Sequence, residues 1–211
     1  GVQTCGSSDL AAPVVHIWYL RGTRSWLAYL LGGIEPKEEL KAKQLEKVIY
    51  FAANLVTWVD KERLDNDRSS LEADYLAERD ELVNERELAL AKRHEELEAE
   101  IAELENQGAK EAEVRNRQRA AERDLAAIRE EHEGNIELLN RTWDEFNSLH
   151  PRQILEDEAL WRELQYRFGE YFEGGMGADA IARLIDRIDL DAEEQKIRDV
   201  IERKDVSAQK R

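Results

Sequence analysis

The sequence predicts a mainly α-helical protein with a small β element and one long antiparallel helical hairpin, which we expect to be a coiled coil. Charged residues make up 37% of the 211 residues, against a usual quarter, and proline occurs only 3 times. Leucine and valine recur at intervals of seven over Leu76–Leu104, which is typical of a helix with one apolar seam. A turn signal at residues 106–108 separates this repeat from a second helical pattern that ends at Pro151.

The β element is expected before the hairpin, within residues 11–66. Val14–Leu20 is rich in β-branched and aromatic residues, and Asn54–Val59 could pair with it as a second strand. Helices are expected at Ser25–Leu31, which is followed by two glycines, and at Leu40–Phe51. These two strands form the only sheet that the sequence suggests.

The hairpin is expected to occupy residues 67–150. A capping box at Ser69–Glu72 predicts the start of its first helix, and Gly108 is expected to adopt the left-handed conformation at its tip. One seam line of that helix consists of Leu76, Val83, Leu90, Leu97 and Leu104, and a weaker line of Ala73, Asp80, Glu87, His94 and Ile101. In the return helix His132 and Asn135 are expected to take seam positions, beside Gly134. Helices of ~38 residues would make the hairpin about 55 Å long.

Residues 151–211 are expected to return to a compact fold. Helices are predicted at Glu156–Phe168 and Ala178–Ile188, with a loop at Gly174–Gly177 between them. A further capping box at Asp191 and Glu194 predicts a last helix.

The charge of the chain is concentrated in the predicted hairpin. Residues 60–150 hold 27 Asp and Glu against 14 Lys and Arg, a net charge of −13 out of −16 for the whole chain. Phosphates repel such a segment, so we expect it to face away from DNA or toward a protein.

The single cysteine, Cys5, excludes an internal disulfide and favours a cytoplasmic protein. No apolar run is long enough to span a membrane.

The sequence contains no recognisable catalytic, cofactor-binding or metal-binding constellation. The four histidines, His16, His94, His132 and His150, lack partners at metal-ligand spacing, and the glycines at 174–177 lack the pattern of a phosphate loop. The five tryptophans could stack on bases but are expected to pack in a core. Arg21 and Arg24 are the candidate site: they could contact nucleic acid or another subunit, or form a local ion pair.

Two blocks on either side of the hairpin resemble a known family. They read AAPVVHIWYLRGTRSWLAYLL with LEKVIYFAANLVTWVD, and LWRELQYRFGEYFEGGMGADAIARLIDRIDLDAE. In wording and order they are similar to the clamp region near the N-terminus of the β′ subunit of bacterial DNA-directed RNA polymerase. The segment between them resembles the helical insertion of actinobacterial β′ chains. Residues 1–10 match neither the family nor a structural pattern and are expected to be a non-native leader.

The resemblance implies a clamp-core fold in two parts, residues 11–66 and 151–211, around the inserted hairpin at 67–150. It also implies a role in transcription, with other RNA polymerase subunits as partners, and with DNA and σ factor reached only through the parent assembly. Membrane partners are not implied.

The resembled enzyme is a nucleotidyltransferase that uses Mg and Zn. Its NADFDGD motif and zinc-ribbon cysteines are absent here, so we expect this chain to hold no cofactor and to be inactive alone. The resemblance also leads us to expect that the chain stops before the helices that bind σ factor.

A second interpretation is a free-standing coiled-coil interaction module, in which the hairpin is the whole function. A reading frame that continued into Cys-rich and NADFDGD-containing sequence would distinguish the two.

Overall fold

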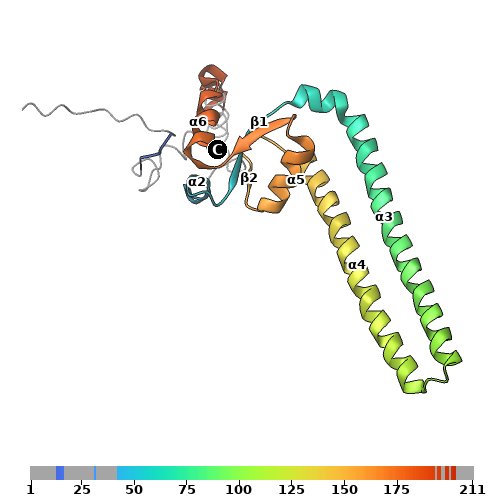
Figure 1. Cartoon of the computed structure of the whole chain (residues 1–211). Coiled ribbons are helices and arrows are strands. Elements are labelled where there is room, and N and C mark those ends of the chain that lie inside the picture. The colour runs from blue at the N-terminus through green and yellow to red at the C-terminus, as the bar shows by residue number, and fades with distance from the viewer. Residues whose placement is uncertain are drawn as a thin grey trace, which may run out of the picture. The chain divides into compact units, whose positions relative to one another are not determined.

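The computed structural model describes residues 13–16, 31, 42–192, 194–195, 198–199 and 201–202, and its cartoon is shown in Figure 1. The described chain divides into two compact units. One unit takes residues from both parts of the chain, 1–61 and 149–211, and we call it the base. The other is the continuous stretch Glu62–Ser148, which we call the hairpin.

A three-stranded antiparallel sheet joins the two parts of the base. Strand β1 (Asn54–Val59) lies in the centre, between β2 (Ile154–Leu155) and β3 (Phe172–Gly175). In this register Leu55 faces Ile154 on one side and Gly175 on the other. Residues separated by about a hundred positions in the sequence are therefore hydrogen-bonded neighbours.

The helices of the base whose bounds lie within the described residues are α2 (Ala42–Ile49), α5 (Glu158–Phe168) and α6 (Gly177–Asp186). The apolar core is formed by α2, β1, α6 and Leu31. Its buried residues are Leu31, Leu45, Val48, Ala53, Leu55, Ala180, Ile181 and Leu184. Burying each of the larger side chains contributes roughly 1.5–3 kcal/mol, so this core can hold α2 and α6 against the sheet.

Helix α5 begins where the sequence supplies a cap. The Asp157 carboxylate accepts hydrogen bonds from the backbone amides of Ala159 and Leu160, at 3.0 and 3.1 Å, which satisfies two amides of the first turn. The helix buries Leu160, Trp161, Leu164 and Phe168. The Trp161 ring and the Phe172 ring on β3 pack in a T-shaped arrangement, with ring centroids 5.5 Å apart.

The structure corrects the predicted strand pairing. Residues 13–16 form no strand, and residues 17–20 lie outside the described part of the chain. Strand β1 is present as predicted, but it pairs with two strands of the second block. The sequence suggested no strand at Ile154–Leu155 because two residues are too few for an alternating pattern.

The predicted loop at Gly174–Gly177 is also partly wrong, because Gly174 and Gly175 belong to β3. A Cβ at Gly174 would lie 2.4 Å from the Leu55 carbonyl oxygen and 2.6 Å from the Trp161 ring. Glycine is therefore needed here so that the strand can pair closely while the indole packs over it. At Gly177 the backbone is left-handed, with φ at +78°.

Two long helices make up the hairpin unit. Helix α3 (Lys61–Asn106) and helix α4 (Glu111–Ser148) run antiparallel beside one another (Figure 1). Their 46 and 38 residues correspond to about 69 and 57 Å. The turn between them has Gly108 at φ +72°, as predicted, and the Ala109 amide donates to the Leu104 carbonyl.

Helix α3 begins earlier than the predicted capping box. Ser69 and Glu72 lie inside it, because the residues from Lys61 onward already continue the helix. An ion pair between Arg63 and Asp67, four residues apart, supports this first part. A capping-box pattern within a run of good helix formers is therefore not sufficient to predict where a helix begins.

Candidate functional site

The candidate pair taken from the sequence, Arg21 and Arg24, lies outside the described residues. Within the described part of the chain, no group of three or more His, Cys, Asp or Glu side chains could hold a metal ion. Among the described helices, none is long and apolar enough to cross a membrane. A cluster of charged side chains lies between the two helices of the hairpin.

The inner face of α3 carries two lines of residues, each with a period of seven. The predicted apolar line is mostly half-buried, although Leu76 is exposed. The predicted second line is wrong, because its first four members are exposed. The second line lies three positions after the first, at Arg79, Arg86, Arg93 and Glu100, all of them half-buried or buried. This line of three arginines and a glutamate is present in the sequence, but an apolar heptad pattern does not include it because all four residues are charged.

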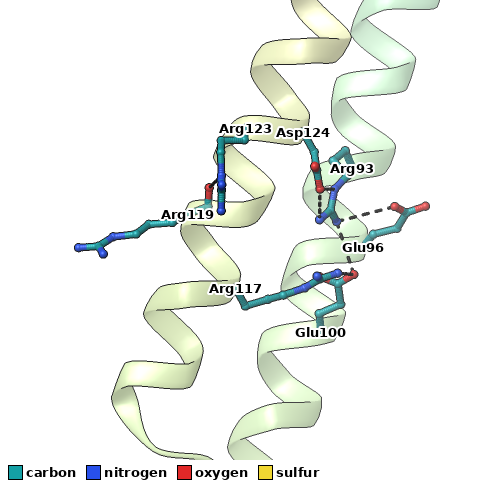
Figure 2. Close-up of polar contacts among 7 residues, drawn as sticks. All are labelled: Arg93, Glu96, Glu100, Arg117, Arg119, Arg123 and Asp124. Carbon is teal, nitrogen blue, oxygen red and sulfur yellow. Dashed lines mark hydrogen bonds and ion pairs between the residues drawn. The ribbon is translucent and has the colours of Figure 1, made fainter.

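Arg93 is the centre of the polar contacts between the helices (Figure 2). Its side chain is only 10% exposed. Nε and Nη2 both donate to Asp124 Oδ2 on α4, at 3.2 and 3.0 Å. Nη1 lies 3.6 Å from Glu100 Oε1 and 3.8 Å from Glu96 Oε2, without a hydrogen bond within the described structure. Three carboxylates thus surround one buried guanidinium.

Arg117 on α4 forms the second link. Its Nε donates to Glu100 Oε2 at 2.5 Å, and its Nη2 donates to Oε1 of the same carboxylate. This two-pronged bond is the main reason why the pKa of Glu100 is lowered, and Arg93 adds to the effect. The same contact raises the pKa of Arg117. Both groups therefore stay charged over the physiological pH range.

These pairs lie symmetrically about the turn. Glu100 is nine residues before Ala109 and Arg117 nine residues after Gly108, while Arg93 and Asp124 are each sixteen residues away. Antiparallel helices in one fixed register produce this symmetry. Sliding one helix by a turn would break both links at once.

Aromatic side chains link the helices at the other end of the hairpin. Tyr75 on α3 stacks on Trp143 of α4, with ring centroids 4.9 Å apart and planes within 5°. The Tyr75 hydroxyl donates to Asn140 Oδ1 at 2.9 Å. Long side chains therefore connect α3 and α4 at this end of the hairpin.

One predicted seam position on α4 is wrong. Asn135 is exposed, and the half-buried or buried positions there are His132, Ile136 and Leu139. The inner residue that follows His132 is Ile136, four positions later, and not Asn135, three positions later. Asn135 therefore lies outside the seam. Replacing it with leucine would therefore not fill a gap between the helices.

Each of the three described tryptophans packs against an aromatic or basic side chain of its own unit. Trp161 is buried in the base, and Trp58 lies under the Arg187 guanidinium, 5.2 Å from the ring centroid. Trp143 belongs to the hairpin, while Trp18 and Trp26 lie outside the described residues. The described tryptophans have packing partners within the chain.

The ionic cluster in the hairpin is suited to positioning. Arginine keeps its proton at all physiological pH values, and the hydrogen bonds from Arg117 lower the pKa of Glu100. Groups that do not change charge near neutrality are poor proton donors and acceptors. What the cluster can do is hold two helices in one register.

Comparison with known proteins shows which sequences the chain resembles. No protein-family model matches the chain. It is 46% identical over 199 residues to the DNA-directed RNA polymerase subunit beta′ of Corynebacterium jeikeium (strain K411), a match over 94% of the chain. The same subunit of Thermobifida fusca (strain YX) is also 46% identical over 199 residues, and that of Salinispora tropica 44% over 200. The chain is homologous to a segment of the β′ subunit.

The β′ relatives are much longer than this chain, which spans 14–15% of their length. The match covers base and hairpin together. The resemblance in the two sequence blocks is therefore confirmed, and it extends through the hairpin between them. Sequence reasoning missed Arg93 and its partners because it searched for chemistry that acts on a substrate.

Proposed function

We propose that this chain is a structural segment of the RNA polymerase β′ subunit, located in its clamp and acting in DNA-templated transcription. The observation that carries the proposal is the 46% identity to β′ subunits over 94% of the chain. The base fixes the segment in the subunit, and the hairpin is an insertion that it supports. The segment works mechanically in the cytoplasm.

The proposal assigns nucleotidyl transfer to other parts of β′. The zinc and magnesium of the resembled enzyme would be held by motifs that this chain does not contain. Within the described residues, no cluster of three potential ligands would fit either ion. We expect the purified chain to show no polymerase activity and to bind no stoichiometric zinc.

The partners that follow from the proposal are the other polymerase subunits. Contact with DNA and σ factor would be made by the assembled enzyme. The hairpin, at a net charge of −13 over residues 60–150, offers DNA little attraction.

A chimeric β′ subunit tests the proposal. The matching segment of the Thermobifida fusca subunit is replaced by this chain, and the chimera is produced together with the remaining polymerase subunits. We expect it to co-purify with them and to transcribe a DNA template with a single-stranded tail, which bypasses promoter recognition.

The matched control is the same chimera with Leu55→Asp, which places a charge in the base core where Leu55 is fully buried. It should fail to assemble. A correctly folded chimera that does not join the other subunits would contradict the proposal and favour a free-standing interaction module.

A further inference from the structure

The outer face of α4 near the turn carries three arginines. Arg115, Arg119 and Arg123 follow each other at intervals of four residues, which places them on one side of the helix, and all three are exposed. Figure 2 shows Arg119 extending from α4 on the side away from α3. We call these three residues the arginine stripe.

Two members of the stripe lack acidic partners. Arg115 pairs with Glu111 at 3.2 Å, and both side chains are largely exposed. Arg123 Nε donates to the Arg119 backbone carbonyl at 3.3 Å. Within the described structure, neither Arg119 nor Arg123 meets a carboxylate, whereas the neighbouring Arg117 is bonded through two nitrogens.

Helix stability does not account for the stripe. Like charges four residues apart destabilise a helix, and the stripe contains two such pairs. Carboxylates are plentiful, because residues 60–150 hold 27 of them against 14 basic residues. A sequence chosen only for a stable hairpin would place Glu four residues from Arg119 and Arg123, where the chain has arginine or alanine.

The stripe also differs in charge from the helix opposite. Residues 110–123 contain five Lys and Arg and three Glu, a net charge of +2. Residues 94–106 of α3 contain six Glu and neither Lys nor Arg. The arginine stripe is therefore a local basic surface on a strongly acidic hairpin.

The charges around the stripe favour a partner with confined negative charge. A nucleic acid carries phosphates along its whole length and would meet the carboxylates of the hairpin on either side. A helix with Glu at every fourth position repeats its charges at about 6 Å, the same rise that separates the arginines of the stripe. Each guanidinium could then form a two-pronged bond with one carboxylate.

We propose that the arginine stripe is a docking surface for an acidic helical segment of another protein. This interaction is additional to the role in β′ and does not depend on it. Exposed charge pairs are individually weak, so the contact is salt-dependent and gains strength from several pairs acting together.

The test uses the full chain labelled with ¹⁵N and an alanine-based peptide that carries Glu at every fourth position. Amide chemical shifts are followed at low salt as the peptide is added. We expect shifts confined to residues 112–126, and no comparable shifts with a peptide in which Gln replaces Glu. The variant Arg119→Gln/Arg123→Gln should bind about fivefold more weakly, as the loss of two exposed charge pairs implies.

The matched control is Lys92→Gln/Arg129→Gln, which removes two exposed basic residues of the hairpin outside the stripe. Its affinity should stay within about twofold of the unchanged chain, the effect of losing distant, screened charges. Equal weakening by both variants, or no binding at all, would overturn the proposal. A 20-base-pair DNA duplex that binds more tightly, and loses affinity in Arg119→Gln/Arg123→Gln, would assign the stripe to phosphates and also overturn it.

Discussion

Gly134 lies in the interior of α4, where glycine stabilises a helix less than any residue except proline. A Cβ at this position would meet no heavy atom within 4 Å, so alanine fits without displacing a neighbour. We expect Gly134→Ala to raise the free energy of unfolding of the hairpin by about 0.5–1 kcal/mol, because alanine loses less backbone entropy. Urea denaturation followed by far-UV circular dichroism measures the change.

The control for this prediction is Gly108→Ala at the turn. Gly108 has φ +72°, a conformation that costs an L-residue roughly 1–2 kcal/mol, so this variant should be less stable. If Gly134→Ala were also destabilising, Gly134 would have a packing role that the structure does not contain.

Gly174 is a glycine of the opposite kind. Because its Cβ would lie 2.4 Å from the Leu55 carbonyl oxygen, alanine must push β3 away from β1 or displace Trp161. We expect Gly174→Ala to destabilise the base by about 1–3 kcal/mol, the usual cost of overpacking. Tryptophan fluorescence during urea denaturation reports it, and an unchanged midpoint would mean that β1 and β3 are not paired at this position.

At the scale of the helices, we expect replacing Arg93 and replacing Asp124 to change the stability of the hairpin by different amounts. Arg93 is buried while Asp124 is 55% exposed, so water can solvate Asp124 if Arg93 is replaced. We expect Arg93→Met to leave stability within about 1 kcal/mol of the original, since an apolar residue of similar size can replace a buried ion. Asp124→Ala removes the best partner of a buried charge and should cost about 1–3 kcal/mol.

Thermal melts of both variants measure this difference. Spin labels at the exposed residues Glu85 and Glu131 provide a second measure, because the distribution of distances between the helices should broaden in Arg93→Met if the cluster sets their register. A larger loss of stability in Arg93→Met than in Asp124→Ala would contradict this account.

The pKa of Glu100 gives the hairpin a dependence on pH. Its folded-state pKa is lowered below the ordinary value of 4.5, chiefly by the hydrogen bonds from Arg117. The charged form is therefore favoured by folding, and its contribution is complete above pH 4.5 and lost as the pH falls through the lowered pKa. We expect Glu100→Gln to melt at a lower temperature at pH 7, and the two melting temperatures to converge in acid below pH 4.5.

Melting curves recorded between pH 7 and pH 2.5 test this expectation. Arg117→Gln should follow the same pattern, because it removes the other half of the pair. A constant difference between the original chain and Glu100→Gln across this range would show that Glu100 acts by its shape alone.

The sequence was sufficient to predict the hairpin as an element. The seven-residue repeat and Gly108 located both helices and the turn, because those features depend on local conformation and on one apolar line. It did not identify the second line on α3, because Arg79, Arg86 and Arg93 are residues that usually face solvent. Only their partners on α4 make them inner residues.

At the scale of the whole molecule, the prediction of a mainly helical chain with a small sheet was correct. The members of that sheet were not predicted, since β2 is too short to be recognised and β3 contains two glycines that resemble a loop. Pairing between Val56 and Gly174 depends on contacts over a hundred residues apart, which no local pattern records. The candidate arginines of the first block stay a prediction, because they lie outside the described residues.

The central claim is that two separate blocks of the sequence form one base into which the hairpin is inserted. Replacing residues 62–148 with a short glycine and serine linker tests it directly. In nuclear Overhauser spectra, the shortened chain should keep the cross-strand contacts of β1 with β2 and β3, including those between Val59 and Phe172. A shortened chain that loses these contacts and shows the narrow amide dispersion of an unfolded protein would contradict the claim.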